Sequence, residues 1–196
     1  MVDRASEPVL AILSLGGNLG DVVAAFASTA CDLNGHPDVA VAGQSSLWRT
    51  RPWGLADQPD FLNMALAVET TLTPEALLDV CQSIEKGQGR IRVQRWGPRT
   101  LDIDIVVFGT LEVRTERLAL PHPRAHERGF VLAPLCEIAP DTELKGRNAE
   151  DWLKDLSPDT SDRASQLSGW TLDSAATQRL AQLLDVQCGS RQTARE

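Results

Sequence analysis

The sequence predicts an α+β protein in which an antiparallel sheet carries helices on one face. Three observations lead to this fold class. Segments with strand and helix patterns follow the order β-α-β-β-α-β, residues 61–69 alternate between two faces, and two helices begin at clear capping signals. The length of 196 residues suits one domain, or one domain with an appendage.

The N-terminal elements are marked by an apolar run and a helix cap. Residues 9–15, VLAILSL, form a short apolar run that is typical of a buried strand. Asp21 can cap the helix that follows, and the Asn-Gly pair at 34–35 ends it. A second strand is expected over 39–48, before a loop over 50–60 that is rich in proline and glycine.

The next elements complete the predicted sheet. Even-numbered apolar residues of strand 61–69 point toward the helices, and odd-numbered residues point to the other face. A Thr-Pro-Glu sequence opens a helix over 73–87. Residues 101–108, LDIDIVVF, form a fourth strand, and an edge hairpin over 111–119 and a helix over 128–138 follow. The order matches the split βαβ motif, so we expect a ferredoxin-like sheet.

The C-terminal part differs from the rest in composition. Residues 157–169 are polar and typical of a linker, a helix is predicted over 173–186, and the last ten residues are expected to be disordered. We therefore divide the chain into a main domain, 1–156, and an extension, 157–196, and expect the main domain to fold alone. If four apolar residues (Trp170, Leu180, Leu183 and Leu184) dock on the core, truncation would instead abolish soluble expression or lower the melting temperature strongly, which would overturn this expectation.

Charge and cysteine content narrow the class of protein. The net charge of −8 argues against nonspecific nucleic-acid binding, which needs a basic surface. No apolar run reaches the ~18–20 residues of a membrane span, and the N-terminus does not resemble a signal peptide, so we expect a cytoplasmic chain. The four cysteines lie far apart without a CxxC pair, which predicts neither a zinc site nor a disulfide scaffold and fits a reducing compartment.

The pair Asp102 and Asp104 is the sharpest local signal. Two residues apart on a strand, the carboxylates share one face and repel each other unless a cation neutralises them. Mg²⁺ suits hard oxygen ligands of this kind. A solvent-facing polar stripe is the alternative interpretation. The opposite face of the strand is expected to hold Leu101, Ile103, Ile105 and Val107.

Three further features could complete a site at these carboxylates. Phe61 and Asn63 are expected on the same open face, where a ring and an amide suit a flat heterocycle, although Phe61 could instead be covered by the 50–60 loop. Residues 86–101 carry five basic residues and no acid, which indicates an anion site or a solvated loop. The glycines at 16–20 lack the lysine of a phosphate loop and favour a tight turn.

Five blocks of the sequence carry a family resemblance over residues 9–141. They are LGGNLGD (15–21), RTRPWGLADQPDFLNMA (49–65), QSIEKGQGRIR (82–92), RWGPRTLDIDIVVFG (95–109) and LPHPRAHERGFVLAPLCEIAPD (120–141). Together they resemble the 6-hydroxymethyl-7,8-dihydropterin pyrophosphokinases. The resemblance implies a ferredoxin-like enzyme of folate biosynthesis that transfers pyrophosphate from ATP to the pterin alcohol and releases AMP.

The resemblance also implies roles for individual residues. Asp102 and Asp104 would hold two Mg²⁺ ions, and Phe61 and Phe130 would sandwich the pterin while Asn63 reads its edge. Three residues would shape the pterin pocket: Thr50, Arg51 and Trp53. The implied ATP contacts are Gln58, Gln82, Glu85, Arg90, Arg92, Arg99, Ile105, His122 and Arg128. The implied catalytic residues beside the aspartates are Arg90, Arg92, Trp96 and Arg99, the last two on a closing loop.

Some positions depart from the family pattern, and other functions stay open. Gly17 stands where a serine is frequent, and Arg51, Trp53 and Pro123 are also unusual. An RNA-recognition module would need a basic sheet face, a metal-dependent nuclease would not need the Phe61 and Asn63 pair, and an inactive homologue would lose its motifs. We expect small-molecule substrates, neither nucleic acid nor membrane as partner, and a monomer.

Overall fold

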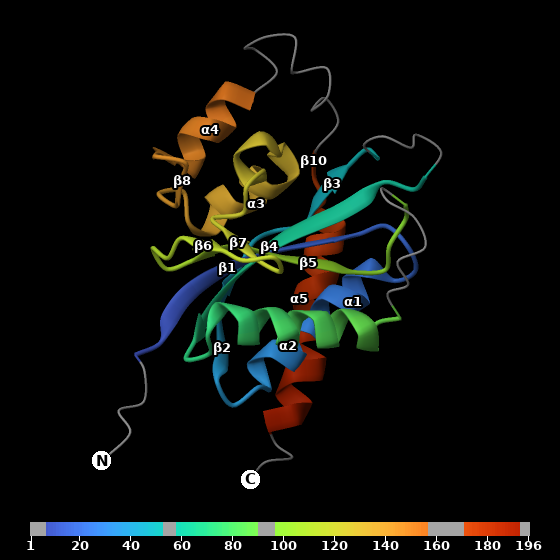
Figure 1. Ribbon diagram of the computed structural model, residues 1–196. Helices are drawn as coiled ribbons and strands as arrows, with labels where there is room; N and C mark the ends of the chain where they lie inside the picture. The colour runs from blue at the N-terminus through green and yellow to red at the C-terminus, as the bar shows by residue number, and fades with distance from the viewer. Residues whose placement is uncertain (1–6, 53–57, 90–96, 157–170, 193–196) are drawn as a thin grey trace, which may run out of the picture.

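The computed structural model describes residues 7–52, 58–89, 97–156 and 171–192, and it places one main sheet between two groups of helices (Figure 1). The elements and their bounds are β1 (Val9–Gly17), α1 (Val22–Asn34), β2 (Val39–Gln44), β3 (Trp48–Thr50), β4 (Phe61–Thr70), α2 (Pro74–Gly87), β5 (Asp102–Phe108), β6 (Val113–Arg114), β7 (Ala119–Leu120), a 3₁₀ turn (Ala125–Glu127), α3 (Gly129–Ile138), β8 (Glu143–Leu144), β9 (Arg147–Asn148), α4 (Ala149–Leu156), β10 (Thr171–Leu172) and α5 (Ser174–Gln192).

The main sheet is antiparallel, as predicted, with the order β10-β3-β4-β1-β5 and with β2 also paired to β4. The strand expected over 39–48 is two strands, because the chain leaves the ladder at Ser45. The Ser45 hydroxyl accepts a hydrogen bond from the Ala65 amide at 2.9 Å, in place of a backbone carbonyl. The α+β class is therefore confirmed, with an interrupted edge that β3 completes.

Helix caps act as the sequence predicts. The Asp21 carboxylate accepts from the Ala24 amide at 3.1 Å, and the Thr73 hydroxyl accepts from the Ala76 amide at 3.2 Å. Both satisfy amides that have no partner within the first turn. α1 and α2 consequently begin at the expected residues.

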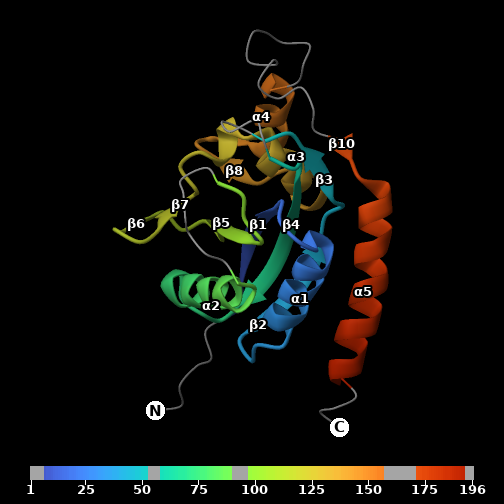
Figure 2. The same cartoon turned by 90° about the vertical axis from the view of Figure 1, so that its right-hand side faces the viewer.

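Both faces of the sheet are covered, although only one was expected to be. α1, α2 and α5 pack on the first face and α3 and α4 on the second (Figures 1 and 2). The second cluster forms because Ile12, Ala67 and Val107 turn apolar side chains to that face. Val107 was expected on the first face. A register shift between β1 and β5 at Ile12/Leu13 moves it across, and Phe108 joins the first core instead.

The C-terminal part is more structured than the sequence suggested. The hairpin β8–β9 and helix α4 were not predicted, and α5 continues to Gln192. Leu180 is 1% exposed in the main core, with Leu183 and Leu184 partly buried against it, so three of the four named residues dock on the core. Trp170 lies outside the described residues. Within the described part of the chain, no helix combines the length and apolar character of a membrane span.

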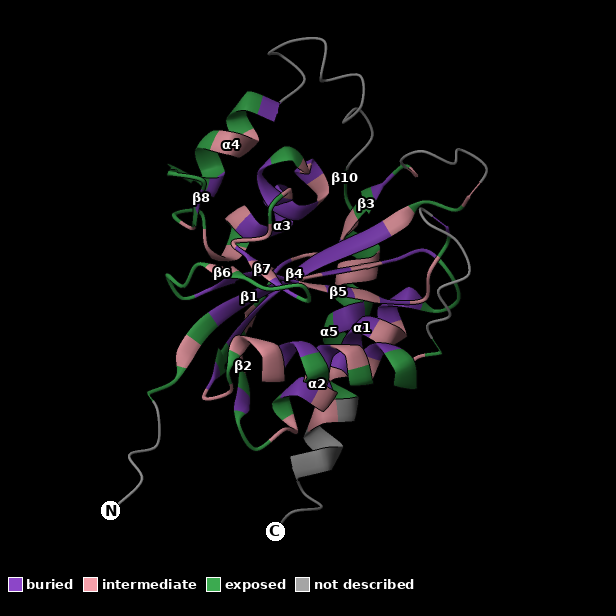
Figure 3. Cartoon of the chain, in the orientation of Figure 1, coloured by how far each residue is buried: buried purple, intermediate pink, exposed green. Residues whose placement is uncertain are grey.

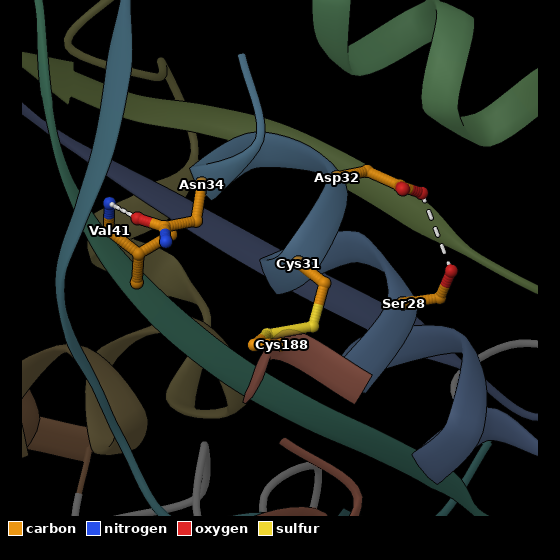
Figure 4. Close-up of a disulfide and its surroundings, with 6 residues drawn as sticks. All are labelled: Ser28, Cys31, Asp32, Asn34, Val41 and Cys188. Atoms are coloured by element: carbon orange, nitrogen blue, oxygen red, sulfur yellow. Dashed lines mark hydrogen bonds between the residues drawn. A yellow bond between two sulfur atoms is a disulfide. The ribbon is translucent and has the colours of Figure 1, made fainter. Parts of the chain in front are cut away.

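A disulfide joins Cys31 of α1 to Cys188 of α5 (Figure 4), which corrects the expectation of isolated thiols. The two Cα atoms lie 5.4 Å apart although 157 residues separate them in sequence. The helices lie side by side in Figure 2, and this packing brings the sulfurs together. Sequence spacing carries no trace of such a contact. Cys81 and Cys136 are free thiols.

Candidate active site

The aspartate pair lies at the start of β5, beside β1. Asp102 pairs in register with Gly16 and Asp104 with Ser14. Both carboxylates are partly exposed, whereas Ile103 and Ile105 between and after them are buried in the main core. The shared face predicted from strand alternation is therefore present at the start of β5, whereas β4 is buried along nearly all of its length (Figure 3).

Each aspartate belongs to a chain of three side chains. The Arg99 guanidinium pairs with Asp102 and lies 5.7 Å from the centre of the Phe61 ring. Arg128 Nη1 lies 3.9 Å from Asp104 Oδ2, and its guanidinium lies 5.7 Å from the centre of the Phe130 ring. Cation–π contacts of this geometry are attractive. Two strand carboxylates, two arginines and two partly exposed rings thus line one face.

The turn between β1 and α1 fixes the backbone of Arg99. The Asn18 and Leu19 amides donate to the Arg99 carbonyl at 2.9 and 3.1 Å, and the Arg99 amide donates to Asn18 Oδ1 at 2.9 Å. Asn18 is 6% exposed and also donates to Gln58 Oε1 at 3.3 Å. Sequence reasoning took this turn as structural and missed Asn18, whose partners lie 40 and 81 residues away.

Gly17 is explained by the same turn. A Cβ at this position would lie 2.6 Å from the Thr100 carbonyl oxygen, a distance that real Cβ atoms essentially never show. The serine that is frequent in the resembling family would therefore need the 99–100 segment to move. Glycine at position 17 is therefore explained by the close approach of two backbone segments, and not by the loss of a side-chain contact.

Asn63 of β4 is held by β3. It is 4% exposed, and its Nδ2 donates to Thr50 Oγ1 at 3.0 Å and to the Trp48 carbonyl at 3.4 Å. Thr50 is itself 9% exposed, and Arg51 follows it at the surface. The structure therefore brings Thr50 and Asn63 together, and their amide and hydroxyl groups lie beside Phe61 at the start of β4.

Helix α2 reaches the other side of β5. Glu85 is 4% exposed, and its Oε1 accepts from the Ile103 amide at 2.7 Å. Because Ile103 lies between the two aspartates, this hydrogen bond to the Glu85 carboxylate fixes the strand that carries them. Gln82, three residues earlier on α2, is partly exposed.

A pocket of about 320 Å³ opens beside Asp104. Its walls combine an apolar part, which includes Leu78, Ile105 and Leu118, with a polar part that includes Asp104. The other polar lining residues are Thr115, Glu116, Arg117 and His122. Thr115 and Arg117 were missed because the 111–119 hairpin gave no sign of which way it faces.

Burial changes the protonation of two groups near this pocket. Burial, aided by the neighbouring Arg128 charge, lowers the pKa of His122 to about 4, so the ring is neutral at pH 7. Burial also lowers the pKa of Arg128, against the opposing effect of Asp104. Arg128 is thus a partly desolvated cation, and it suits an incoming anion better than a fully hydrated one.

Four candidate residues cannot be placed in this site. Trp53, Arg90, Arg92 and Trp96 lie outside the described residues. No cluster of three or more histidine, cysteine or carboxylate side chains that could hold a metal is present in ranges 7–52, 58–89, 97–156 and 171–192. A larger cavity of about 500 Å³ lies between the β1–α1 turn, β4 and α5, and its lining includes none of the predicted site residues.

Comparison with known proteins identifies the family of this chain. Residues 12–140 match the sequence model of the 7,8-dihydro-6-hydroxymethylpterin-pyrophosphokinase family. A 2-amino-4-hydroxy-6-hydroxymethyldihydropteridine pyrophosphokinase from Methylorubrum extorquens is 47% identical over 148 residues, 76% of this chain and 94% of that protein. The protein of the same name from Bacillus subtilis is 45% identical over 141 residues, 72% of this chain and 84% of that protein.

A solved structure supports the fold. The Plasmodium falciparum HPPK-DHPS crystal structure with pteroate superposes with a TM-score of 0.64 at 14% identity, over 87% of this chain and 47% of that longer chain. At this identity the likeness concerns the fold alone, and this chain spans about half of that protein. The match over residues 12–140 and the two relatives together show that the chain belongs to the 7,8-dihydro-6-hydroxymethylpterin-pyrophosphokinase family.

Proposed function

We propose that this chain transfers the pyrophosphoryl group of ATP to 6-hydroxymethyl-7,8-dihydropterin on the face formed by β4 and β5. Its family carries out pyrophosphokinase chemistry in folate biosynthesis; the assignment of particular residues to that reaction is the proposal. The observation that carries it is the pair of β5 aspartates, each joined to an arginine that lies over an aromatic ring. The cytoplasmic setting and monomeric state expected from the sequence belong to the same proposal.

The nucleotide binds with its base in the 320 Å³ pocket and its phosphates toward β5. The apolar walls at Leu78 and Ile105 suit a purine, and Thr115 and His122 offer polar groups in the lining. Neutral His122 can accept a hydrogen bond on one ring nitrogen and donate from the other. Asp104, which also lines the pocket, then marks the start of the phosphate region.

When ATP binds, its phosphates replace the two aspartates as partners of the arginines. Arg99 and Arg128 now balance single carboxylates, and a triphosphate offers a larger anionic charge with oxygens arranged for bidentate guanidinium contacts. Their release also uncovers Phe61 and Phe130, whose faces bind the pterin ring while Asn63 hydrogen-bonds its edge. Of the family's further basic residues, Arg90 and Arg92 would add charge to the same region, and Trp96 would close over it.

Asp102 and Asp104 fit Mg²⁺. Mg²⁺ in phosphoryl-transfer sites is held by one or two carboxylates together with substrate phosphates and water, so a pair of aspartates with no third histidine, cysteine or carboxylate ligand among the described residues matches this use. Both carboxylates stand on the partly exposed face and can turn from the arginines to the ions. When bound, the ions would neutralise charge on the phosphate oxygens.

The chain's own residues then align an in-line displacement. The pterin hydroxymethyl oxygen forms a bond to the β-phosphorus, the bond from that phosphorus to the α–β bridging oxygen breaks, and AMP leaves with that oxygen. Arg99 and Arg128 stabilise the charge that develops. The hydroxyl proton passes to solvent or to one of the aspartates, and no dedicated base is needed.

Product analysis tests the proposal directly. The full-length protein is incubated with ATP, MgCl₂ and 6-hydroxymethyl-7,8-dihydropterin, and the products are followed by ³¹P NMR and nucleotide chromatography. We expect AMP and a pterin diphosphate in equal amounts, only when the pterin is present, and no turnover in EDTA until MgCl₂ is restored. ADP with a pterin monophosphate would contradict the bond assignment, and full turnover in EDTA would contradict the Mg²⁺ assignment.

A further inference from the structure

The orientation of the Asn63 amide depends on the position of β3. Both hydrogen-bond acceptors given above for Asn63 Nδ2, Thr50 Oγ1 and the Trp48 carbonyl, belong to this three-residue strand. On the other side, Gly16 leaves room for the carbonyl end, because a Cβ there would lie 3.3 Å from Asn63 Oδ1. A shift of β3 would therefore turn or release the amide.

The outer edge of β3 is paired with the C-terminal segment. Thr171 and Leu172 of β10 stand opposite Arg49 and Trp48. Immediately before β3, the Leu47 carbonyl accepts from the Asp173 amide at 2.8 Å. The Leu47 amide donates to Thr177 Oγ1 at 2.9 Å. The segment that enters β3 is thus bound on both its donor and its acceptor by residues more than 120 positions later.

Asp173 joins the strand to the helix that follows. Its Oδ1 accepts from the Ala176 amide at 2.9 Å, which caps α5, and its Oδ2 accepts from Arg49 Nε at 3.1 Å. Thr177 donates its hydroxyl proton to the Asp173 carbonyl at 2.8 Å while accepting from Leu47. Asp173, which caps α5, and Thr177 in its first turn therefore carry the contact with the residues around β3.

α5 is itself anchored to α1. Leu180 is buried in the main core, Arg179 Nη1 donates to Asp21 Oδ1 at 2.9 Å, and Cys188 is joined to Cys31. Asp21 caps α1, directly after the turn whose Asn18 holds Arg99. The first turn of α5 is consequently a fixed support for β3.

We propose that Asp173 and Thr177 are positioning residues for the pterin half of the site, which hold β3 so that Thr50 and Trp48 orient the Asn63 amide. The inference rests on the proposed function, because it takes Asn63 as the group that reads the pterin. Both residues lie beyond the 12–140 family match, so the support comes from the part of this chain that the family match does not include.

A matched pair at Thr177 tests this role. Thr177→Val keeps the shape but removes the hydroxyl, and Thr177→Ser keeps the hydroxyl. We expect Thr177→Val to raise the KM for the pterin by about 3- to 10-fold, the ratio that one hydrogen bond contributes, while the KM for ATP stays within twofold. Thr177→Ser should restore the wild-type pterin KM. Asp173→Asn, which keeps the helix-cap oxygen and weakens the Arg49 pair, should act in the same direction.

Two controls separate this role from general destabilisation. Asp155 lies on α4, far in sequence from β3, and forms an exposed ion pair with Arg147 of β9. Asp155→Asn breaks this pair and should leave both KM values unchanged. Amide hydrogen exchange at Leu47 and Arg49 should be faster in Thr177→Val than in Thr177→Ser. Equal KM values for Thr177→Val and the wild type, equal rises for both substrates, or no rescue by serine would overturn the proposal.

Hydrogen exchange keeps the inference distinct from the proposed function. If the wild type forms no AMP with the pterin, the proposed function fails, and the exchange measurement still decides whether Thr177 holds β3. Unchanged exchange at Leu47 in Thr177→Val would then overturn the positioning role as well. An active wild type with unchanged exchange and kinetics in Thr177→Val would overturn the inference alone.

Discussion

Helices α1 and α5 lie side by side on the same face of the sheet, yet they are held in different ways (Figure 2). α1 buries eight of its 13 residues, including Phe26 and Leu33. Among the described side chains of α5, only Leu180 is fully buried, with Leu183 and Leu184 partly buried beside it. The helix is also held by polar and covalent contacts, which include the hydrogen bond to Thr177, the ion pair at Arg179 and the disulfide at Cys188.

The difference separates two kinds of stability. Apolar burial of α1 is spread over many contacts and depends little on salt, acid or reductant. The contacts of α5 are few, specific and chemically distinct, so each can be removed by its own condition. A region held like α1 should carry the reaction, and a region held like α5 should tune it. The predictions below test this division.

The largest effect should come from the β5 carboxylates. Asp102→Asn or Asp104→Asn should lower kcat by about 10³-fold or more, because each removes an anionic ligand from a site that must neutralise phosphate charge. The free energy of unfolding should change by no more than about 1 kcal/mol, because relief of like-charge repulsion offsets the loss of the ion pairs with the arginines. Steady-state kinetics and melting curves measure the two quantities.

Asp141→Asn is the matched control for this prediction, because Asp141 is exposed at a turn after α3. It should keep wild-type kcat. Near-normal turnover in either β5 variant at saturating MgCl₂ would show that the aspartates are not the metal ligands. A large loss of melting temperature would show instead that their role is structural.

Truncation after residue 156 should give the next largest effect. The sequence predicted that this truncation leaves a stable, active domain, but the buried Leu180 and the disulfide both lie beyond it. Losing them should lower the free energy of unfolding by about 4 kcal/mol, or roughly 8–16 °C in Tm. Residual activity, with a raised pterin KM and an unchanged ATP KM, would place the chemistry in residues 1–156. An unchanged Tm would show that α5 does not stabilise the main domain.

The sequence was informative wherever structure depends on neighbours along the chain. Asp21 and Thr73 each mark a helix start, because each caps an amide only three residues later in the chain. Alternation in β4 and β5 likewise placed Asn63 and the aspartates on one face. These signals are local, so one sequence suffices to see them.

The features that the sequence missed depend on contacts between distant residues. The break at Ser45 needs the amide of Ala65, the crossing of Val107 needs a register shift against β1, and the disulfide needs α1 beside α5. In the site, Asn18 was missed because its role appears only when residue 99 lies beside it. In such cases the tertiary fold determines which distant residue makes the contact, and no local sequence pattern reveals it.

Reduction of the disulfide should have a smaller effect than truncation. Cys31→Ser, or dithiothreitol on the wild type, should lower the free energy of unfolding by about 2–3 kcal/mol because it frees a long loop in the unfolded chain. The pterin KM should change less than twofold, since Cys188 lies 15 residues, or about 22 Å of helix, from Asp173. Cys136→Ala, which removes a free thiol, is the control. A KM change as large as that of Thr177→Val would place the support for β3 at the far end of α5.

The smallest of these effects on stability should come from acid, which weakens the contacts of the Asp21 and Asp173 carboxylates at the start of α1 and α5. The Arg179 hydrogen bonds, followed by the Ala24 amide, lower the pKa of Asp21, and the Ala176 amide and Arg49 lower the pKa of Asp173. A carboxyl whose folded pKa is lowered stabilises the fold above its unfolded pKa, near 3.8, and loses that contribution as the pH falls through the folded pKa. The contribution is therefore complete at pH 7 and is lost progressively as the pH falls below about 4.

The difference in Tm between the wild type and Asp21→Asn measures this contribution between pH 7 and pH 3. We expect at most about 3 °C at pH 7, because both partners are half exposed, and a convergence toward zero below about pH 4. The difference at pH 7 should also shrink in 1 M salt. Arg179→Gln should give the same pH profile, and the double variant should add nothing further, because the two residues form one interaction. A difference that persists unchanged at pH 3 would show that the substitution acts on the uncharged helix cap and that the ion pair to α5 contributes nothing.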